Sequence, residues 1–224
     1  RTFTDAVQVG ETLTSDDGAI YAEVTYNDAP DGRRVLVGWL RQQPHEGRAW
    51  TGAQSVLRLL TLRSAGKGTT LCQRPVPEVD TLRGQRWVVR DQPLTEQVRL
   101  EDLDLSSRAL DVQVVLDLRY AAEGGVQLRL GDGTVVTVGV NSAARQLFVR
   151  LGDDRRVTTG CAVDKGTAVL RVLFDQDIVE AFAGDTSAVT TYLPHGQCYE
   201  QLSVYGCGVA PHLVRADAWT LGNS

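Results

Sequence analysis

Three acidic residues in the C-terminal half are the first candidates for chemistry, because hydrolysis of glycosidic bonds uses paired carboxylates. Asp175, Asp177 and Glu180 follow one another closely in the sequence. Asp175 and Asp177 share one side of an extended chain if a strand continues through them, but Asp-Gln-Asp also suits a hairpin turn. We therefore expect a turn at residues 175–177. Glu180 remains the acid that an independent glycosidase in this sequence would use.

Aromatic side chains form the second group of candidates. Tyr21, Trp39 and Trp50 could line a sugar pocket, because aromatic faces stack on sugar C–H surfaces and polar tips give orientation. The same residues could instead fill the core between strands. Trp50 follows a polar loop and precedes Gly52, which favours the pocket. The other two tryptophans, Trp87 and Trp219, are expected in a core or at a domain interface.

The histidines and cysteines give no sign of a metal centre or a nucleophile. The three histidines have no carboxylate or cysteine at metal-ligand spacing; they are His45, His195 and His212. The four cysteines lack the close pairs of a zinc site; they are Cys72, Cys161, Cys198 and Cys207. They permit either buried thiols or one or two disulfides, including one that involves Cys198 and Cys207. We expect no metal and no cofactor.

Charge and composition argue against two classes of partner, nucleic acids and membranes. The 224 residues carry a formal net charge of −5 without a basic stripe, which argues against a nucleic-acid partner. No apolar run approaches the roughly 18 residues of a membrane span, so no membrane partner is expected. The sequence lacks Met and begins at Arg1, which favours processing, truncation or a removed leader. With the even cysteine count, this leads us to expect a secreted or extracytoplasmic protein.

The elements that must position these residues are almost all strands, so the predicted fold class is all-β. Four strands in the first 74 residues are close to the content of one propeller blade, and we expect them at 20–26, 34–40, 53–62 and 69–73. Pro75 and Pro77 open a connector, since proline cannot donate to a ladder. We assign 1–74 to a first unit, 75–93 to a linker and 94–224 to a β-sandwich.

Short strands separated by Gly and Asp turns are typical of a sandwich. We expect a short helix at 102–108. The sandwich strands are expected at 95–100, 109–119, 125–130, 134–141, 146–150, 156–161, 168–174, 178–183, 188–193, 201–205 and 212–220.

The order of several short motifs resembles glycoside hydrolase family 32, which contains invertases, inulinases, levanases and fructosyltransferases. The first unit carries IYA at 20–22, GRRVLVGW at 32–39, WTGA at 50–53 and SVLR at 55–58. The second carries LRVLFD at 170–175, VEAF at 179–182 and ADAWTL at 216–221. Leu57 departs from the family pattern, which has Pro at that place.

The resemblance implies the last blade of a five-bladed β-propeller followed by a C-terminal β-sandwich. The family's three acidic motifs belong to earlier blades and are not found here, since Arg90-Asp91-Gln92-Pro93 does not match. The implied reaction is retaining fructosyl transfer on sucrose, levan or inulin, by two carboxylates about 5 Å apart. The implied partner is an N-terminal propeller chain, without which strand edges would be exposed and the chain unstable or aggregated.

Two alternatives stay open. The chain could be a carbohydrate-binding β-sandwich module without catalysis, or an independent glycosidase that uses Glu180. In the first reading, Tyr21, Trp39 and Trp50 border a pocket whose acids lie elsewhere.

Overall fold

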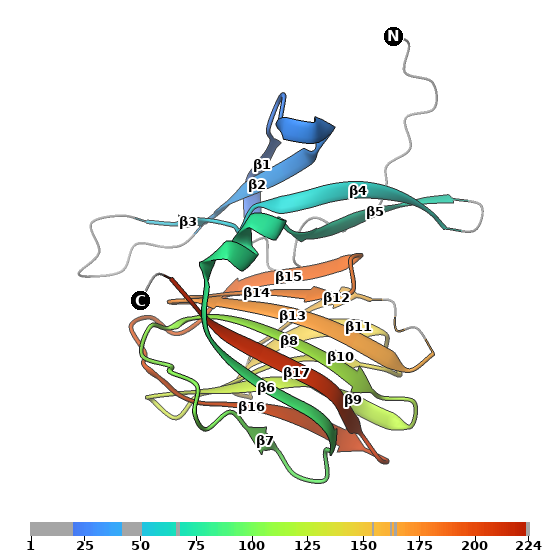
Figure 1. The fold of residues 1–224 in the computed structure, drawn as a ribbon, viewed down its shortest axis with the longest axis vertical. Coiled ribbons are helices and arrows are strands. Elements are labelled where there is room, and N and C mark those ends of the chain that lie inside the picture. Colours follow the sequence, from blue (N-terminus) through green and yellow to red (C-terminus); the bar gives the residue numbers. More distant parts are fainter. Residues whose placement is uncertain are drawn as a thin grey trace.

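Three antiparallel β-sheets make up the described part of the chain in a computed structural model (Figure 1). The structure describes residues 20–41, 51–65, 68–153, 155–161, 163 and 165–222. Two of the residues singled out in the sequence, His45 and Trp50, lie outside these ranges. The predicted all-β fold class is confirmed, and the described residues contain no helix that could span a membrane.

The N-terminal sheet (residues 20–75, called the blade) has the strand order β1-β2-β4-β5, with β3 paired to β2. Its strands are Ile20–Thr25 (β1), Arg34–Leu40 (β2), Ala53–Gln54 (β3), Arg58–Ala65 (β4) and Gly68–Pro75 (β5). A short 3-10 turn, Pro30–Gly32, connects β1 to β2.

The predicted strand 53–62 is wrong in one respect, because it is two strands with a break at residues 55–57. The Ser55 hydroxyl accepts the Gly38 backbone N–H at 3.0 Å, so a side chain replaces the backbone partner at the break.

The connector between the sheets is shorter than predicted. Pro75 ends β5, and Pro77 opens a 3-10 helix, Pro77–Leu82, where a missing N–H costs nothing. Residues 83–93, assigned above to the linker, instead form a strand, Arg83–Pro93 (β6), that pairs with the last strand of the chain. Their weak periodicity reflects an edge position, and Pro93 is tolerated at the strand end.

The C-terminal part (residues 83–222, called the sandwich) packs two six-stranded sheets face to face, in the orders β12-β11-β10-β9-β16-β7 and β15-β14-β13-β8-β17-β6. Its remaining strands are Val98–Arg99 (β7), Ala109–Asp117 (β8), Ala121–Leu130 (β9), Val135–Asn141 (β10), Gln146–Leu151 (β11), Arg155–Gly160 (β12), Thr167–Asp175 (β13), Ile178–Ala183 (β14), Ser187–Tyr192 (β15), Tyr199–Gly208 (β16) and His212–Leu221 (β17). Each predicted sandwich strand overlaps one of these.

The short helix expected at 102–108 is not formed. Asp104 accepts the Ser106 backbone N–H at 2.9 Å, which closes a turn, and Arg108 has a φ of 53°. Asp and Ser side chains compete with helical hydrogen bonds in this way, so the segment follows its turn chemistry.

The sandwich core lies between the two sheets and follows the alternation of the strands. Val112, Val114 and Leu116 of β8 are at most 1% exposed. The residues between them on β8 face outward and are partly exposed, as a half-buried strand requires. The sandwich therefore has a hydrophobic core of its own.

Candidate functional site

The blade rests on the β14–β15 side of the sandwich, with the 3-10 helix between them (Figure 1). A small buried cluster joins the three parts and consists of Val35, Leu59, Val76, Val79, Leu173, Phe182 and Ala188. Because residues of both parts share this cluster, the junction is a packed interface rather than a loose hinge.

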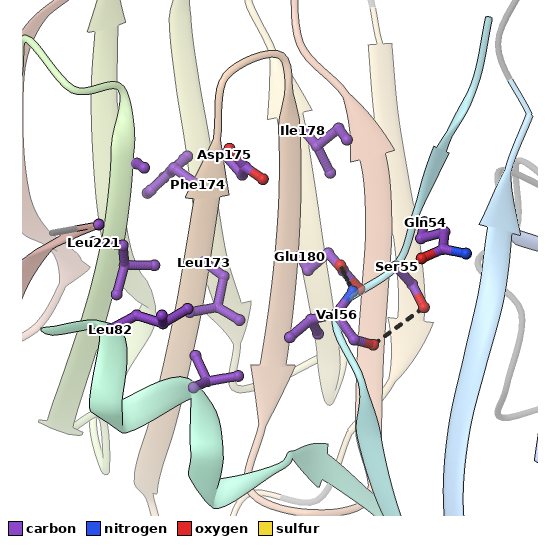
Figure 2. Close-up of a pocket in the computed structure, with 13 residues that line it drawn as sticks. Gln54, Ser55, Val56, Leu82, Leu173, Phe174, Asp175, Ile178, Glu180 and Leu221 are labelled. Carbon is purple, nitrogen blue, oxygen red and sulfur yellow. Dashed lines mark hydrogen bonds between the residues drawn. The ribbon is translucent and has the colours of Figure 1, made fainter. Parts of the chain in front are cut away.

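A cleft of about 370 Å³ opens beside this cluster (Figure 2). Its wall is largely apolar, with Leu82, Leu173 and Ile178 among the lining residues. Polar groups enter from the blade side through Gln54 and Ser55. The lining residues also include Asp175 and Glu180, so the structure brings two of the candidate acids to one cleft.

Glu180 is a buried structural carboxylate and not a free acid. Its Oε1 accepts the Val56 backbone N–H at 2.5 Å, and its Oε2 accepts a hydrogen bond from Arg58 Nη2 at 2.5 Å. Thr190 Oγ1 lies 3.2 Å from the same Oε2. The Arg58 and Glu180 side chains are 1% and 6% exposed. Both oxygens are therefore occupied, and the idea of an independent glycosidase built on Glu180 is not supported by the geometry.

The other two acids of the group have separate roles. Asp175 pairs with Ile178 across the hairpin, and Gln176 has a φ of 54°, so the turn expected at 175–177 is formed. Partial burial raises the pKa of Asp175; the Glu180 carboxylate adds to the rise and Arg108 opposes it. Asp177 accepts hydrogen bonds from Arg108 Nη2 at 2.6 Å and from the Gly196 N–H at 3.1 Å.

Asp177 also contacts His195 Nδ1. Glu180 and Asp177 are both held by hydrogen bonds, so no two of the three acids form a catalytic pair. This histidine contact could not be read from the sequence, because the two residues meet only through the fold.

Tyr21 and Trp39 do come together. They are opposite partners in the β1–β2 ladder, with ring centroids 6.1 Å apart and planes at 66°. They are 51% and 45% exposed, so this aromatic pair is not a closed core. The Arg41 guanidinium lies 4.5 Å from the centre of the Tyr21 ring. The remaining member of the predicted aromatic set, Trp50, is outside the described residues.

Gly52 supports the Trp39 indole. It has a φ of 75°, and a Cβ at this position would overlap Trp39 Nε1. Only glycine combines this backbone conformation with so close an approach. This contact between Gly52 and Trp39 was not evident from the sequence alone.

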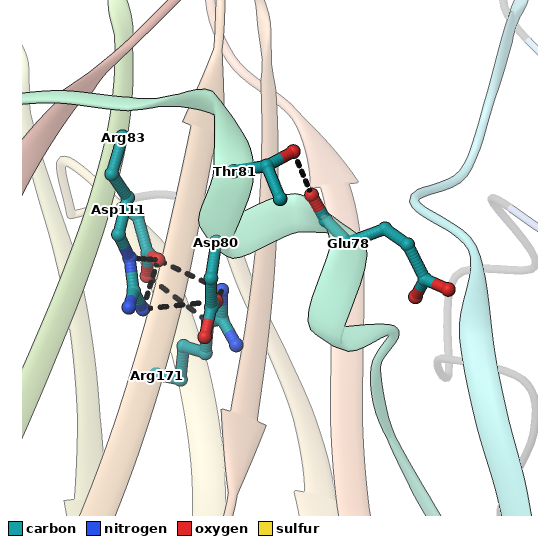
Figure 3. A network of polar contacts seen from close by, with 6 residues as sticks. All are labelled: Glu78, Asp80, Thr81, Arg83, Asp111 and Arg171. Carbon is teal, nitrogen blue, oxygen red and sulfur yellow. Dashed lines mark hydrogen bonds and ion pairs between the residues drawn. The ribbon is translucent and has the colours of Figure 1, made fainter.

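Trp219 and Trp87 belong to the sandwich, as expected for core or interface residues. Trp87 packs against the sandwich core. Trp219 is partly buried beneath the Arg83 guanidinium, 3.8 Å from the ring centre. Arg83 belongs to an ion-pair network in which Asp111 accepts from Arg83 at 2.6 Å and from Arg171 at 2.8 Å (Figure 3).

Asp80 of the 3-10 helix joins the same network through Arg171 at 2.7 Å. The connector is therefore fixed to the sandwich by charge as well as by apolar packing.

All four cysteines are free thiols, with Cys72 and Cys161 buried and Cys198 and Cys207 exposed. Cys198 precedes β16 and Cys207 lies near its other end, so roughly 30 Å of extended strand separates them. A bond between these two is excluded, and the cysteines lend no support to an extracytoplasmic location. Among the described residues, no group of His, Cys, Asp and Glu could hold a metal ion.

The fold is a five-stranded sheet of the size of one propeller blade, joined to a β-sandwich. Two family models agree with this division, the glycosyl hydrolases family 32 N-terminal domain over residues 1–75 and the family 32 C-terminal domain over 78–220. The chain belongs to glycosyl hydrolase family 32.

Curated relatives include a levanase of Bacillus sp. (strain L7), 28% identical over 205 residues, which cover 80% of this chain and 22% of the relative. A sucrose-6-phosphate hydrolase of Escherichia coli is 27% identical over 202 residues, covering 87% of this chain and 41% of that protein. The chain thus spans well under half the length of these relatives.

Solved structures show the same fold. Fructan 1-exohydrolase IIa from Cichorium intybus matches with a TM-score of 0.75 at 18% identity, over 92% of this chain and 48% of that chain. Exo-inulinase from Aspergillus awamori matches with a TM-score of 0.72 at 17% identity, over 92% of this chain and 43% of that one.

Proposed function

We propose that this chain is the C-terminal part of a retaining β-fructosidase or fructosyltransferase that acts on sucrose or on fructans such as levan and inulin. The catalytic acids would lie on an N-terminal part that supplies the other propeller blades. Family membership supports the glycosidase class, and the names of the relatives, a levanase and a sucrose-6-phosphate hydrolase, support β-fructosidic substrates.

The observation that carries the proposal is the exposed apolar surface of the blade. Outside the Tyr21–Trp39 pair, three hydrophobic side chains of the blade are 51–68% exposed: Val24, Tyr26 and Leu62. Isolated exposed hydrophobics are ordinary, but three in one small sheet and the turn beside it favour a missing protein neighbour. Neighbouring blades would cover such faces, and this supports an N-terminal propeller part as the partner.

The described acids support the same division of labour. Glu180 is held by Arg58 and Val56, and Asp177 is held by Arg108 and Gly196, so neither is available to a substrate. In the proposed enzyme this chain supplies the sandwich and the closing blade. The exposed pair Tyr21 and Trp39, together with Trp50, would border the substrate pocket, where aromatic faces stack on sugar rings.

The test compares this chain alone, the N-terminal part alone and the two together, with sucrose, levan and inulin as substrates. Fructose release or transfer, measured by chromatography, is expected only when both parts are present. Hydrolysis by this chain alone would contradict the proposal.

A second candidate, a non-catalytic carbohydrate-binding module, is favoured by the exposed Tyr21–Trp39 pair. It predicts that this chain alone binds levan or inulin in calorimetry, and that Trp39→Ala abolishes this binding. The binding-module proposal also predicts that adding this chain to the N-terminal part does not increase fructose release.

A further inference from the structure

We propose that the sandwich positions Trp39 for sugar binding, with Glu180 and Tyr192 as positioning residues that act on the blade from β14 and β15. This inference rests on the proposed function, because it concerns the aromatic pair assigned there to the substrate pocket. It assigns to the sandwich a role beyond stability, argued from two sets of contacts that reach the residues on either side of Trp39.

The first set runs from Glu180 to Gly38. Glu180 Oε1 accepts the Val56 N–H at 2.5 Å, in the break between β3 and β4. Figure 2 shows the Glu180 side chain turned toward this blade segment. Ser55 Oγ donates to the Val56 carbonyl at 3.1 Å and accepts the Gly38 N–H at 3.0 Å. The Ser55 N–H also donates to the Gly38 carbonyl at 2.9 Å.

The second set runs from Tyr192 to Leu40. The Tyr192 hydroxyl donates to the Leu40 carbonyl oxygen at 2.6 Å, across the interface. Leu40 is 1% exposed, and it pairs with Ala53 of β3. The sandwich therefore contacts β2 directly at Leu40, one residue after Trp39. It reaches Gly38, one residue before Trp39, only indirectly, through Val56 and Ser55.

Trp39 lies between Gly38 and Leu40, the two residues that these contacts reach, and its indole packs against Gly52. Gln54 is its ladder partner on β3, and a Cβ on Gly52 would overlap its Nε1. The segment 52–55 that holds the indole is thus the segment that Glu180 fixes through Val56. A stacking side chain held in this way loses little conformational entropy when a sugar binds, which is the energetic value of a preorganised site.

The buried ion pair between Arg58 and Glu180 holds the Val56 segment firmly in place. Glu180 Oε2 and Arg58 Nη2 are 2.5 Å apart, and Arg58 also donates to Gln73 Oε1 at 2.9 Å. Since these groups are almost completely buried, any displacement of the blade segment would break several hydrogen bonds at once. Removal of Glu180 itself would leave a buried charge, so milder changes are needed for the test.

The test uses Tyr192→Phe and Ser55→Ala in the proposed enzyme, that is, this chain together with its N-terminal part. Two matched controls accompany them. Tyr199→Phe removes an equivalent tyrosine hydroxyl bond, to the Gln176 carbonyl at 2.7 Å, within the sandwich. Ser187→Ala removes a serine hydroxyl bond to the Gly160 carbonyl at 2.7 Å, also within the sandwich. Trp39→Ala reports the full loss of the aromatic contact.

Two readouts are taken for each variant. The KM and kcat for sucrose report substrate binding and turnover. The tryptophan emission of each variant, after subtraction of the same variant with Trp39→Phe, reports the environment of Trp39 without any need for activity.

We expect Tyr192→Phe and Ser55→Ala to raise KM by about 2- to 10-fold, the effect of losing one neutral hydrogen bond, with little change in kcat. Their Trp39 emission should move to longer wavelength. Tyr199→Phe and Ser187→Ala should change neither readout, even if they lower the melting temperature by a similar amount.

The outcomes separate the two proposals. If the wild type is active and Trp39→Ala raises KM, while Tyr192→Phe and Ser55→Ala behave like their controls, the positioning role is overturned and the proposed function stands. If the wild type hydrolyses no β-fructoside, the proposed function fails and a role in sugar binding fails with it. A shift in Trp39 emission would then show only that the contacts hold the indole.

Discussion

The sandwich and the blade solve the problem of burying apolar surface in different ways. The sandwich encloses one large cluster between its two sheets, and residues such as Val126, Leu128 and Val138 are fully buried there. The blade shares its buried cluster with the sandwich and leaves Val24 and Leu62 at 60% and 68% exposure. A two-layer fold buries its apolar faces within itself, whereas a single sheet must bury its apolar face against a neighbour.

The interface shows which part depends on the other. Besides the Arg58–Glu180 pair, the Gln73 N–H donates to the Asp185 carbonyl at 2.6 Å, and Arg63 pairs with Asp185 at 3.1 Å. These contacts complete the hydrogen bonding of blade residues with groups of the sandwich. We therefore expect changes at the interface to disturb the blade first.

The largest expected effect concerns the association state. The whole chain should self-associate in solution, because the blade exposes apolar faces, whereas residues 76–222 should be monomeric and unfold cooperatively. Static light scattering of the two samples at equal concentration measures this. If the whole chain is a monodisperse monomer, the blade does not need a further neighbour, and the contrast drawn here between blade and sandwich is wrong.

The second effect concerns the buried ion pair. In this chain combined with the proposed N-terminal part, Glu180→Leu should lower the free energy of unfolding by about 3–5 kcal/mol, because Arg58 is left as an uncompensated buried charge. Adding Arg58→Met should recover much of the loss. Urea denaturation measures both.

Glu200→Leu is the matched control for this pair, since Glu200 is exposed and should change stability by less than about 0.5 kcal/mol. Equal effects at Glu180 and Glu200 would show that the Arg58 pair contributes nothing.

A third, smaller effect lies on strand β17 of the sandwich, at Asp217. Burial opposes ionisation of Asp217, but hydrogen bonds and charge from Arg215 and Arg86 outweigh it and hold the pKa of Asp217 below its ordinary value. Because the folded-state pKa is the lower one, this stabilisation is present above the unfolded pKa of about 3.9 and disappears as the pH falls through the folded value.

Asp217→Asn should therefore cost about 1–2 kcal/mol at pH 7 and less as the pH falls below about 4. Both arginines are partly exposed, so added salt should reduce the cost as well. Asp102→Asn, at an exposed position, is the control and should show neither dependence. A cost that is constant from pH 7 to pH 2 would contradict the assigned ion pairs.

The smallest effect is chemical rather than energetic. Cys198 and Cys207 should react rapidly with a thiol reagent, whereas Cys72 and Cys161 should react slowly because they are buried. Burial also raises the pKa of Cys161 to about 11, which leaves little thiolate at neutral pH.

In mild urea Cys72 of the blade should become reactive before Cys161 of the sandwich. Mass spectrometry of the alkylated peptides measures the order. If the two react together, the blade and the sandwich unfold as one unit.

Much of the fold followed from local patterns. The alternation in β8 and the turn residues between strands predicted the sandwich, because side-chain period and turn chemistry are local properties. Two errors have different origins. Residues 83–93 have a weak pattern, and their strand depends on a distant partner, β17. Residues 102–108 follow a local side-chain hydrogen bond that closes a turn.

The candidate site was less accessible to sequence reasoning. Tyr21 and Trp39 could be proposed together, with Trp50, because aromatic rings stack on sugars. The β1–β2 ladder places Tyr21 and Trp39 opposite each other. The roles of Gly52 and Asp177 depend on where other segments pack against them.

By itself, the sequence determined the all-β class, the order of nearly all strands and the membership of the family 32 group, because these are encoded in periodicity, turns and short motifs. Only the tertiary structure decided that Glu180 is an anchor and not an acid catalyst. Its partner Arg58 is 122 residues away in the chain, and only folding brings the two charges together in a buried place.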